Sequence, residues 1–185
     1  MKRILTIAAA SLLCIAAGAQ SKFAHVNFVE LVQLMPEADE ARAAIAASSQ
    51  EAQETFAAMV KEYEDKYSVY QQKSASWTPA IRETKEKELT EIVQRINDFD
   101  KNIQAELQQQ QQTLMAPIQQ KAINTVNQLA KEGGYIYVFD KTSILYIDES
   151  QSTDLTPAAR KALGIKDGRT LESLQQELAA QAALQ

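Results

Sequence analysis

Residues that commonly carry out chemistry are scarce in this chain of 185 residues, which has a single histidine, His25, and a single cysteine, Cys14. One residue of each kind leaves no basis for a zinc site, a Cys/His nucleophilic pair or a disulfide framework. No glycine lies between Ala19 and Glu132, which excludes glycine-rich phosphate loops over most of the chain. We therefore expect no metal and no cofactor, and we expect His25 to be hydrogen-bonded or solvated.

The 24 Asp and Glu residues are the other candidates for chemistry, as the paired carboxylates of a hydrolase. Such catalysis requires an apolar pocket that raises the pKa of one carboxyl group. Acidic residues such as Glu83, Glu86 and Glu91 instead lie on the outer faces of predicted helices, so the sequence favours a protein that is not an enzyme. The acidic residues also outnumber the 19 Lys and Arg residues, which argues against nucleic acid or an anionic membrane surface as the main partner.

Residues 1–19 have the pattern of a cleavable secretory signal peptide. A basic start precedes an apolar run, and small side chains occupy residues 17–19. The apolar run of about 14 residues is shorter than the roughly 20 that span a bilayer, which disfavours a retained membrane anchor. Leu13 before Cys14 disfavours a lipoprotein. Cleavage before Gln20 leaves 17 basic against 24 acidic residues, so the mature, exported protein is expected to carry a net charge of −7.

Most of the mature chain, residues 36–132, is predicted to form an antiparallel hairpin of two long helices. Pro36 suits the first turn of a helix, and Thr78 stands before another proline in the pattern of an N-cap. The second helix is expected to end at Gly133, the first of two glycines, through a left-handed backbone conformation. These signals give helices of roughly 38 and 54 residues, with the tip of the hairpin near residues 74–79.

Apolar residues recur at steps of three and four along both helices, which predicts a coiled-coil seam between charged outer faces. In the first helix the stripe is Ala52, Phe56, Met59, Tyr63, Tyr67 and Tyr70, and in the second it is Leu89, Ile92, Ile96, Phe99, Ile103, Leu107, Leu114 and Ile118. Pro117 is expected to bend the second helix. The aromatic residues toward the tip are candidate contacts for a bound protein; the alternative is that they only pack the helices together. They are Tyr63, Tyr67, Tyr70 and Trp77, of which Trp77 is expected to be the most exposed.

A small β body is predicted from the residues on either side of the hairpin, with a first strand in 20–35 and further structure in 133–163. Two β-rich runs, 135–139 and 144–147, are separated by four polar residues, which predicts a β-hairpin. Both faces of these strands are apolar and a single thin chain cannot cover them, so oligomerisation is expected. The residues expected to seal the body are Val26, Phe28, Ile136, Val138 and Leu145.

The end of the chain is predicted to contain one short helix and a tail. Asp154 and Thr156 have the pattern of a helix cap, with Thr156 at the N-cap position, and this helix is expected to end near Leu163. Residues 164–185 are expected to be a mobile tail. The predicted fold class is thus α+β and helix-dominated, with a small β body of three strands per chain.

The order of these features resembles the Skp/OmpH family of periplasmic chaperones. The resemblance extends from Phe23 to about Leu163. The stretches that carry it are VNFVELVQLMPE near the start, EGGYIYVFDKTSILYID near the end, and the DLT turn at residues 154–156.

The resemblance implies a homotrimer whose strands build a barrel-like body, from which three helical hairpins project around a cavity. It also implies an ATP-independent holdase that cages unfolded outer-membrane β-barrel proteins in the periplasm and prevents their aggregation. The best-known members are strongly basic, whereas this chain is acidic, which argues against contact with lipopolysaccharide or membranes. The alternative function is a structural or adaptor coiled-coil protein of the cell envelope with a fixed protein partner.

Overall fold

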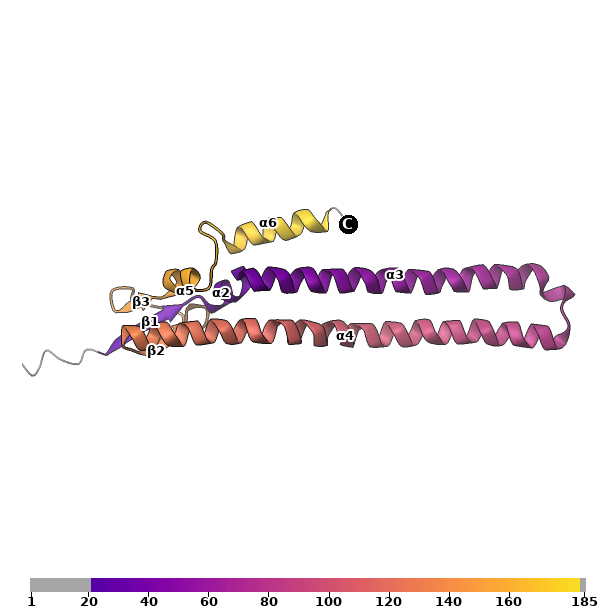
Figure 1. Cartoon of the computed structure of the whole chain (residues 1–185), viewed down its shortest axis with the longest axis horizontal. Coiled ribbons are helices and arrows are strands. Elements are labelled where there is room, and N and C mark those ends of the chain that lie inside the picture. The colour runs from indigo at the N-terminus through magenta and orange to yellow at the C-terminus, as the bar shows by residue number, and fades with distance from the viewer. Residues whose placement is uncertain (1–20, 184–185) are drawn as a thin grey trace, which may run out of the picture. The chain divides into compact units, whose positions relative to one another are not determined.

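The protein is described here by a computed structural model that covers residues 21–183, so the expected signal peptide lies outside the described residues. The fold is dominated by helices and contains one small sheet (Figure 1). In chain order the elements are β1 (Lys22–Val26), α2 (Phe28–Leu34), α3 (Pro36–Lys73), the short 3-10 helix η2 (Ser74–Ser76), α4 (Pro79–Gly133), β2 (Tyr135–Asp140), the 3-10 helix η3 (Lys141–Ser143), β3 (Ser152–Asp154), α5 (Thr156–Ala162) and α6 (Leu171–Ala182).

The chain divides into two compact units. One, which we call the arm unit, comprises residues 37–118. The other, the body unit, comprises residues 21–36 and 119–183 within the described range. Helix α3 therefore lies almost wholly in the arm unit, whereas α4 contributes to both units.

The two long helices start where the local sequence signals place them. Helix α3 has 38 residues and begins at Pro36, and α4 has 55 residues and begins at Pro79. The Thr78 hydroxyl accepts a hydrogen bond from the backbone N–H of Ile81 at 3.4 Å, as expected of an N-cap. Helix α4 continues through Pro117 without interruption.

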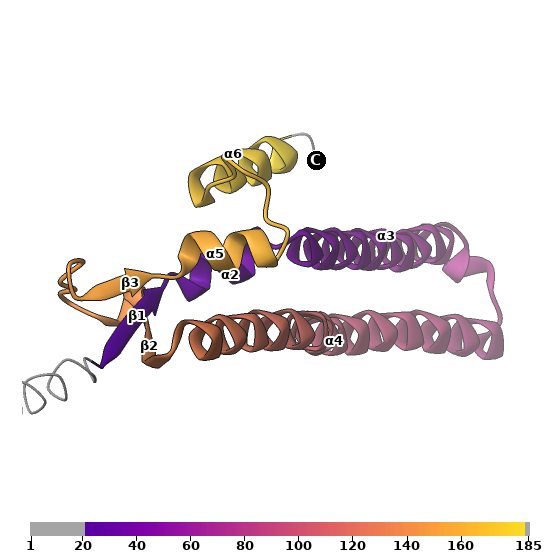
Figure 2. The ribbon, with the colours of Figure 1, turned by 60° about the vertical axis from the view of Figure 1, so that its left-hand side comes forward.

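Helices α3 and α4 of the arm unit lie side by side in both views of the ribbon (Figures 1 and 2). Arg95 bonds Glu62 near the tip, and farther from the tip Gln110 donates to the Ser48 hydroxyl at 2.9 Å. Residue numbers thus rise along α4 as they fall along α3. All eight predicted seam positions of α4 are buried or half-buried.

The sheet has three parallel strands in the order β2-β1-β3. The predicted β-hairpin of residues 135–147 is therefore wrong. After β2 the Asp140 carboxylate accepts a hydrogen bond from Thr142 N–H and starts η3, so the chain turns away. Residues 144–147 form no strand, and β1 pairs with β3 instead. Leu145, expected in a strand of the sealed body, is fully exposed in the single chain.

The first strand is shorter than predicted because Asn27 begins a helix. Its side chain accepts a hydrogen bond from Glu30 N–H at 3.1 Å and thereby caps α2. Phe28, expected to be a strand residue of the body, is the first residue of α2 and is half-buried. Alternation of apolar residues over 24–28 was an ambiguous signal over so short a run.

The last helices correct two expectations. Asp154 Oδ1 accepts a hydrogen bond from Thr156 N–H at 2.8 Å, but the Thr156 hydroxyl does not cap its own helix, because it accepts from the backbone N–H of Asn27. Residues 171–182, expected to belong to a mobile tail, form α6. A capping box of Thr170 and Ser173 starts this helix.

The core of the body unit is almost wholly aliphatic. Burial of each large apolar side chain contributes roughly 1.5–3 kcal/mol to folding. Leu174 of α6 is buried, and α6 contacts α2. The buried apolar residues of this unit are Ala24, Val26, Leu31, Val32, Leu34, Met35, Ala122, Val126, Leu155, Ala159, Leu163, Ile165 and Leu174.

The exit from α4 depends on the second glycine and not the first. Gly134 has a φ of 67°, a conformation that favours glycine, whereas Gly133 is the last helical residue. An added Cβ on Gly133 would lie 2.1 Å from the Tyr135 ring. Gly134 is therefore the glycine that the turn from α4 into β2 requires, whereas a side chain at Gly133 would force the Tyr135 ring to move.

Candidate functional site

The four predicted contact residues lie at the tip of the arm unit, and the structure brings them together in two pairs. Tyr63 and Tyr67 stack with ring centroids 5.7 Å apart, and Tyr70 meets Trp77 edge to face at 5.8 Å. Tyr67 is 41% exposed, whereas the other three are half-buried. Trp77 is less exposed than expected because its ring packs against Tyr70.

Charged pairs close the seam between the helices at the tip. Arg95 of α4 bonds Glu62 of α3 at 2.8 Å, and Lys66 of α3 lies 3.7 Å from Glu88 of α4. The hydrogen bond from Arg95 lowers the pKa of Glu62, and the hydrogen bond from Lys85 lowers the pKa of Glu88. Both carboxylates are therefore stabilised in their charged form.

One tyrosine of the tip cluster bridges the two helices through its hydroxyl. Tyr70 of α3 donates a hydrogen bond to the Glu86 carboxylate of α4. This bond raises the pKa of Tyr70, because ionisation would remove the donated proton beside a negative charge. The ring of Tyr70 thus serves the packing of the tip as well as offering apolar surface.

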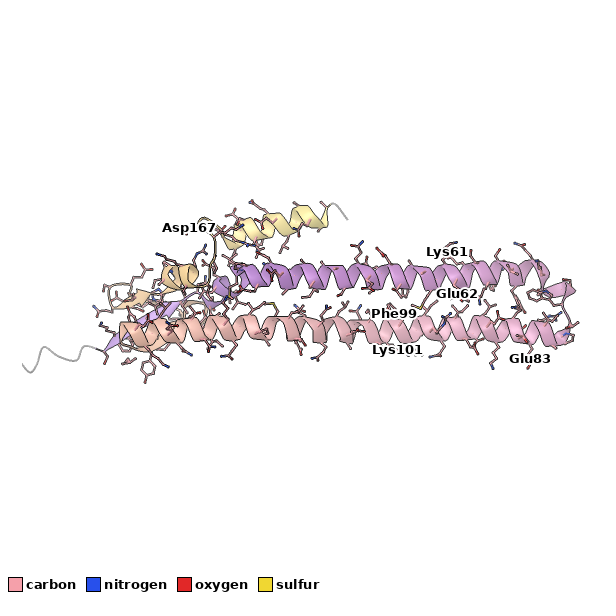
Figure 3. All side chains as sticks on the ribbon, in the orientation of Figure 1. Lys61, Glu62, Glu83, Phe99, Lys101 and Asp167 are labelled. Atoms are coloured by element: carbon pink, nitrogen blue, oxygen red, sulfur yellow. The ribbon has the colours of Figure 1, made fainter. Side chains whose placement is uncertain are left out.

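The middle section of the arm unit is packed less completely than the tip. We define this section as residues 43–60 of α3 and 96–113 of α4. Helix α3 carries Ala43, Ala44, Ala46 and Ala47 here, with serines and Ala52 following. The alanines at 43, 44, 46 and 47 are exposed, and the small residues that face the large side chains of α4 are Ser48, Ser49 and Ala52. Phe99 lies on the side of α4 toward α3 (Figure 3). Small residues against a spaced stripe of large ones cannot fill a seam to interior density.

Two hollows flank the seam of the middle section as a result. Four residues line both of them: Ala52, Phe99, Ile103 and Leu107. The first hollow has a volume of about 300 Å³ and is completed by Ser48, Glu51, Thr55, Glu106 and Gln110. The second has a volume of about 250 Å³ and is completed by Ser49, Gln53, Phe56, Asp100 and Gln104.

The body unit exposes a patch of large apolar side chains. Leu145 and Tyr146 are 108% and 80% exposed, and Tyr137 and Phe139, whose rings contact each other on one face of β2, are 60% and 44% exposed. Next to them is an open, mainly apolar hollow of about 410 Å³, lined by Phe23, His25, Phe139, Ile144, Tyr146, Ile147, Asp148, Gln151 and Ser152. Exposed apolar side chains gathered beside an apolar hollow are typical of a surface that binds a partner.

The only histidine is part of a polar cluster in the sheet. His25 Nδ1 lies 2.9 Å from Ser152 Oγ, and its Nε2 lies 3.9 Å from Asp154. The order serine, histidine, aspartate superficially matches a catalytic triad. However, 3.9 Å is too long for the hydrogen bond that orients a catalytic imidazole, and His25 is 2% exposed. The cluster therefore links β1 to β3.

A polar network that the sequence analysis missed ties three elements of the body unit together. Glu30 of α2 forms an ion pair with Arg160 of α5. The other guanidinium nitrogen of Arg160 donates to the carbonyl of Arg169 at 2.6 Å, just before α6. Asn27 Nδ2 also donates to Glu30 at 3.1 Å. No spacing in the sequence reveals this network, because Glu30 and Arg160 are 130 residues apart.

Among residues 21–183, no cluster of three or more potential ligands is placed to hold a metal ion. Within the same range, no helix combines the length and the hydropathy that a membrane-spanning segment requires.

These features define a class of protein with a small parallel sheet and a long pair of helices, offering exposed side-chain surface and shallow hollows. The chain matches the family described as Outer membrane protein (OmpH-like) over residues 22–163, and it belongs to that family. A solved structure described as an outer membrane chaperone (OmpH-like) from Caulobacter crescentus CB15 has the same fold, with a TM-score of 0.69 at 12% identity. The similarity covers 78% of this chain and 85% of that one. No significant match is found among curated proteins.

Proposed function

We propose that this protein is an ATP-independent holdase of the periplasm that keeps unfolded outer-membrane β-barrel proteins from aggregating. The observation that carries the proposal is the arm unit, whose charged exterior surrounds an incompletely filled apolar seam. Membership of the OmpH-like family and the name of the Caulobacter relative support it. Many weak contacts from such arms can hold an unfolded chain through effective concentration.

The proposal includes a homotrimer assembled through the body unit. The exposed patch around Leu145 and the free edges of β2 and β3 support this, because each edge presents unpaired backbone groups. In the proposed assembly the strands of three chains build a barrel-like body. Helices α3 and α4 then act as an antiparallel coiled-coil hairpin, and residues 1–19 act as the cleaved signal peptide.

The aromatic cluster at the tip is proposed to contribute to client binding. Replacing Tyr63, Tyr67, Tyr70 and Trp77 by serine is expected to weaken binding of an unfolded barrel more than it lowers the melting temperature of the body. Because Tyr70 also bonds Glu86, the single variant Tyr67→Ser provides a test that leaves this bond in place.

The direct experiment measures aggregation of a urea-unfolded outer-membrane barrel after dilution, with and without the mature protein and in the absence of nucleotide. Suppression at a ratio of one trimer per client is the expected result. A protein that binds folded and unfolded barrels alike, or neither, would contradict the holdase and favour the alternative of an envelope adaptor with one fixed partner.

A further inference from the structure

The acidic residues of the arm unit are distributed unevenly along its length. The tip section, residues 61–95, has seven acidic and seven basic residues and is electrically neutral. The middle section has five acidic residues, Glu51, Glu54, Asp98, Asp100 and Glu106, and one basic residue, Lys101. Its net charge is therefore −4, and no arginine is present in it.

The charges of the two sections also differ in how they are paired. At the tip, ion pairs join Lys61 to Asp65, Lys85 to Glu88 and Arg95 to Glu62. In the middle section, the three acids that line the hollows, Glu51, Asp100 and Glu106, form no ion pair with any described residue. Lys101 does not line either hollow.

These acids stand at the rims of apolar hollows. Glu51 and Glu106 line the first hollow from opposite helices, and Asp100 lines the second. The shared floor of both hollows is made by Ala52, Phe99, Ile103 and Leu107. An apolar floor between unpaired carboxylates complements a ligand that presents an apolar side chain close to a cationic one.

We propose that the middle section of the arms is a binding site for extended polypeptide segments in which an apolar residue and a lysine or arginine stand two residues apart and so share one face. In an extended segment, side chains two residues apart point to the same face, so an apolar side chain enters a hollow while a basic side chain two residues away reaches a rim carboxylate. This selectivity rests on the proposed holdase function and specifies which parts of an unfolded client are held first.

The test uses the full mature protein and two fluorescent twelve-residue peptides, one that repeats leucine, serine, lysine and serine and the other with glutamate in place of lysine. Fluorescence anisotropy gives the affinity of each. The basic peptide is expected to bind at least tenfold more tightly than the acidic one at low salt, and this preference is expected to shrink as salt screens the exposed charges.

Two variants with equal net charge locate the site. The combined variant Glu51→Gln, Asp100→Asn and Glu106→Gln is expected to weaken the basic peptide about tenfold, because exposed ion pairs are individually modest and three are lost. The control Glu64→Gln, Glu83→Gln and Glu91→Gln removes three charges from the tip and is expected to change the affinity less than twofold. Ala52→Leu, which fills the floor of both hollows, is expected to weaken both peptides.

Equal affinity for the two peptides, or equal weakening by the two charge variants, would overturn this inference. Aggregation of the unfolded barrel is measured with the same variants to separate the two proposals. If barrels are still protected from aggregation when the peptide preference is missing, the proposed binding site is rejected and the proposed holdase function is retained. If the peptide preference is present but barrels still aggregate, the proposed binding site is retained and the proposed holdase function is rejected.

Discussion

At the scale of single residues, Arg160 joins separate parts of the body unit through polar contacts. Its side chain is 19% exposed and joins Glu30 of α2 to the carbonyl of Arg169 before α6. A hydrogen bond that involves a charged group contributes about 1.5–3 kcal/mol, and removing one partner leaves the other unsatisfied. This residue therefore fixes how α2, α5 and the approach to α6 are joined.

We expect Arg160→Met, which keeps an apolar stem of similar length, to lower the free energy of unfolding by about 2 kcal/mol. Urea denaturation followed by circular dichroism measures this. The neighbouring Lys161 is exposed, so Lys161→Met serves as the matched control and should change stability by less than about 0.5 kcal/mol. Equal effects of the two substitutions would show that the network contributes nothing specific.

At the scale of elements, the tip of the arm unit is expected to loosen in acid. The pKa values of Glu62 and Glu88 are lowered by Arg95 and Lys85 from an ordinary value of 4.5. A carboxyl with a lowered pKa in the folded state stabilises it at pH values above the ordinary pKa, and this contribution disappears as the pH falls through the lowered pKa. The window of loosening therefore lies below pH 4.5.

Amide hydrogen exchange, corrected for intrinsic rates, should show constant protection of the tip from pH 7 to 5 and a loss below about pH 4. Glu62→Gln is expected to remove part of this pH dependence. Glu64→Gln changes a neighbouring acid with no ion pair to a described residue and should leave the dependence intact. Protection that falls between pH 7 and 5 in the wild type would contradict the assignment to these carboxylates.

The arms are also expected to tolerate paired shortening. Ser48 faces Gln110 and Glu62 faces Arg95, which places residues 51–57 opposite residues 101–107. Deleting both heptads keeps the period of the two apolar stripes and removes most of the lining of both hollows. The shortened protein should retain its assembly state by ultracentrifugation and lose the preference for basic segments. Loss of assembly would show that the arms and body do not fold independently.

The boundaries of the long helices were predictable because local residues determine them. Pro36, Thr78 and the glycine pair at 133–134 act within one turn of the helix end. The strand pairing was not predictable, because β1 takes both of its partners from the far end of the chain. Helix α6 was missed because it also depends on a distant partner. It contacts α2 from the start of the chain, and its Leu174 is buried.

The candidate site was predictable only in part. The aromatic cluster at the tip was predictable, because helical spacing places the three tyrosines on one face of α3 and Trp77 lies in the connection that follows. The hollows depend on which residues of α4 face Ala52, and that register is set by the pairing of the two helices. The small residues Ser48, Ser49 and Ala52 and the absence of basic residues between Arg42 and Lys61 were the available signals.

At the scale of the whole molecule, the exposed apolar patch of the body unit should determine assembly. Leu145 makes almost no contact in the single chain, so Leu145→Asp is expected to leave the fold of the chain intact. In the proposed trimer the same change would bury an unpaired charge at a cost of several kcal/mol. Sedimentation equilibrium should therefore give a trimer for the wild type and no trimer for Leu145→Asp.

The matched control is Leu178→Asp, which places the same charge at another exposed leucine, on α6. It should sediment as the wild type does. A wild-type monomer at all concentrations, or equal disruption by both substitutions, would contradict assembly through this patch. Circular dichroism of the same samples distinguishes a loss of assembly from a loss of fold.

The central position of β1 in the sheet constrains how the protein can be made. This strand precedes the arm helices in the sequence, yet His25 is 127 residues from Ser152, its partner on β3. The arm helices, whose contacts are more local, can form before the sheet, which must wait for β2 and β3. Until β2 and β3 pair with it, β1 exposes unpaired backbone groups and apolar side chains, which is the condition that this protein is proposed to shield in other chains.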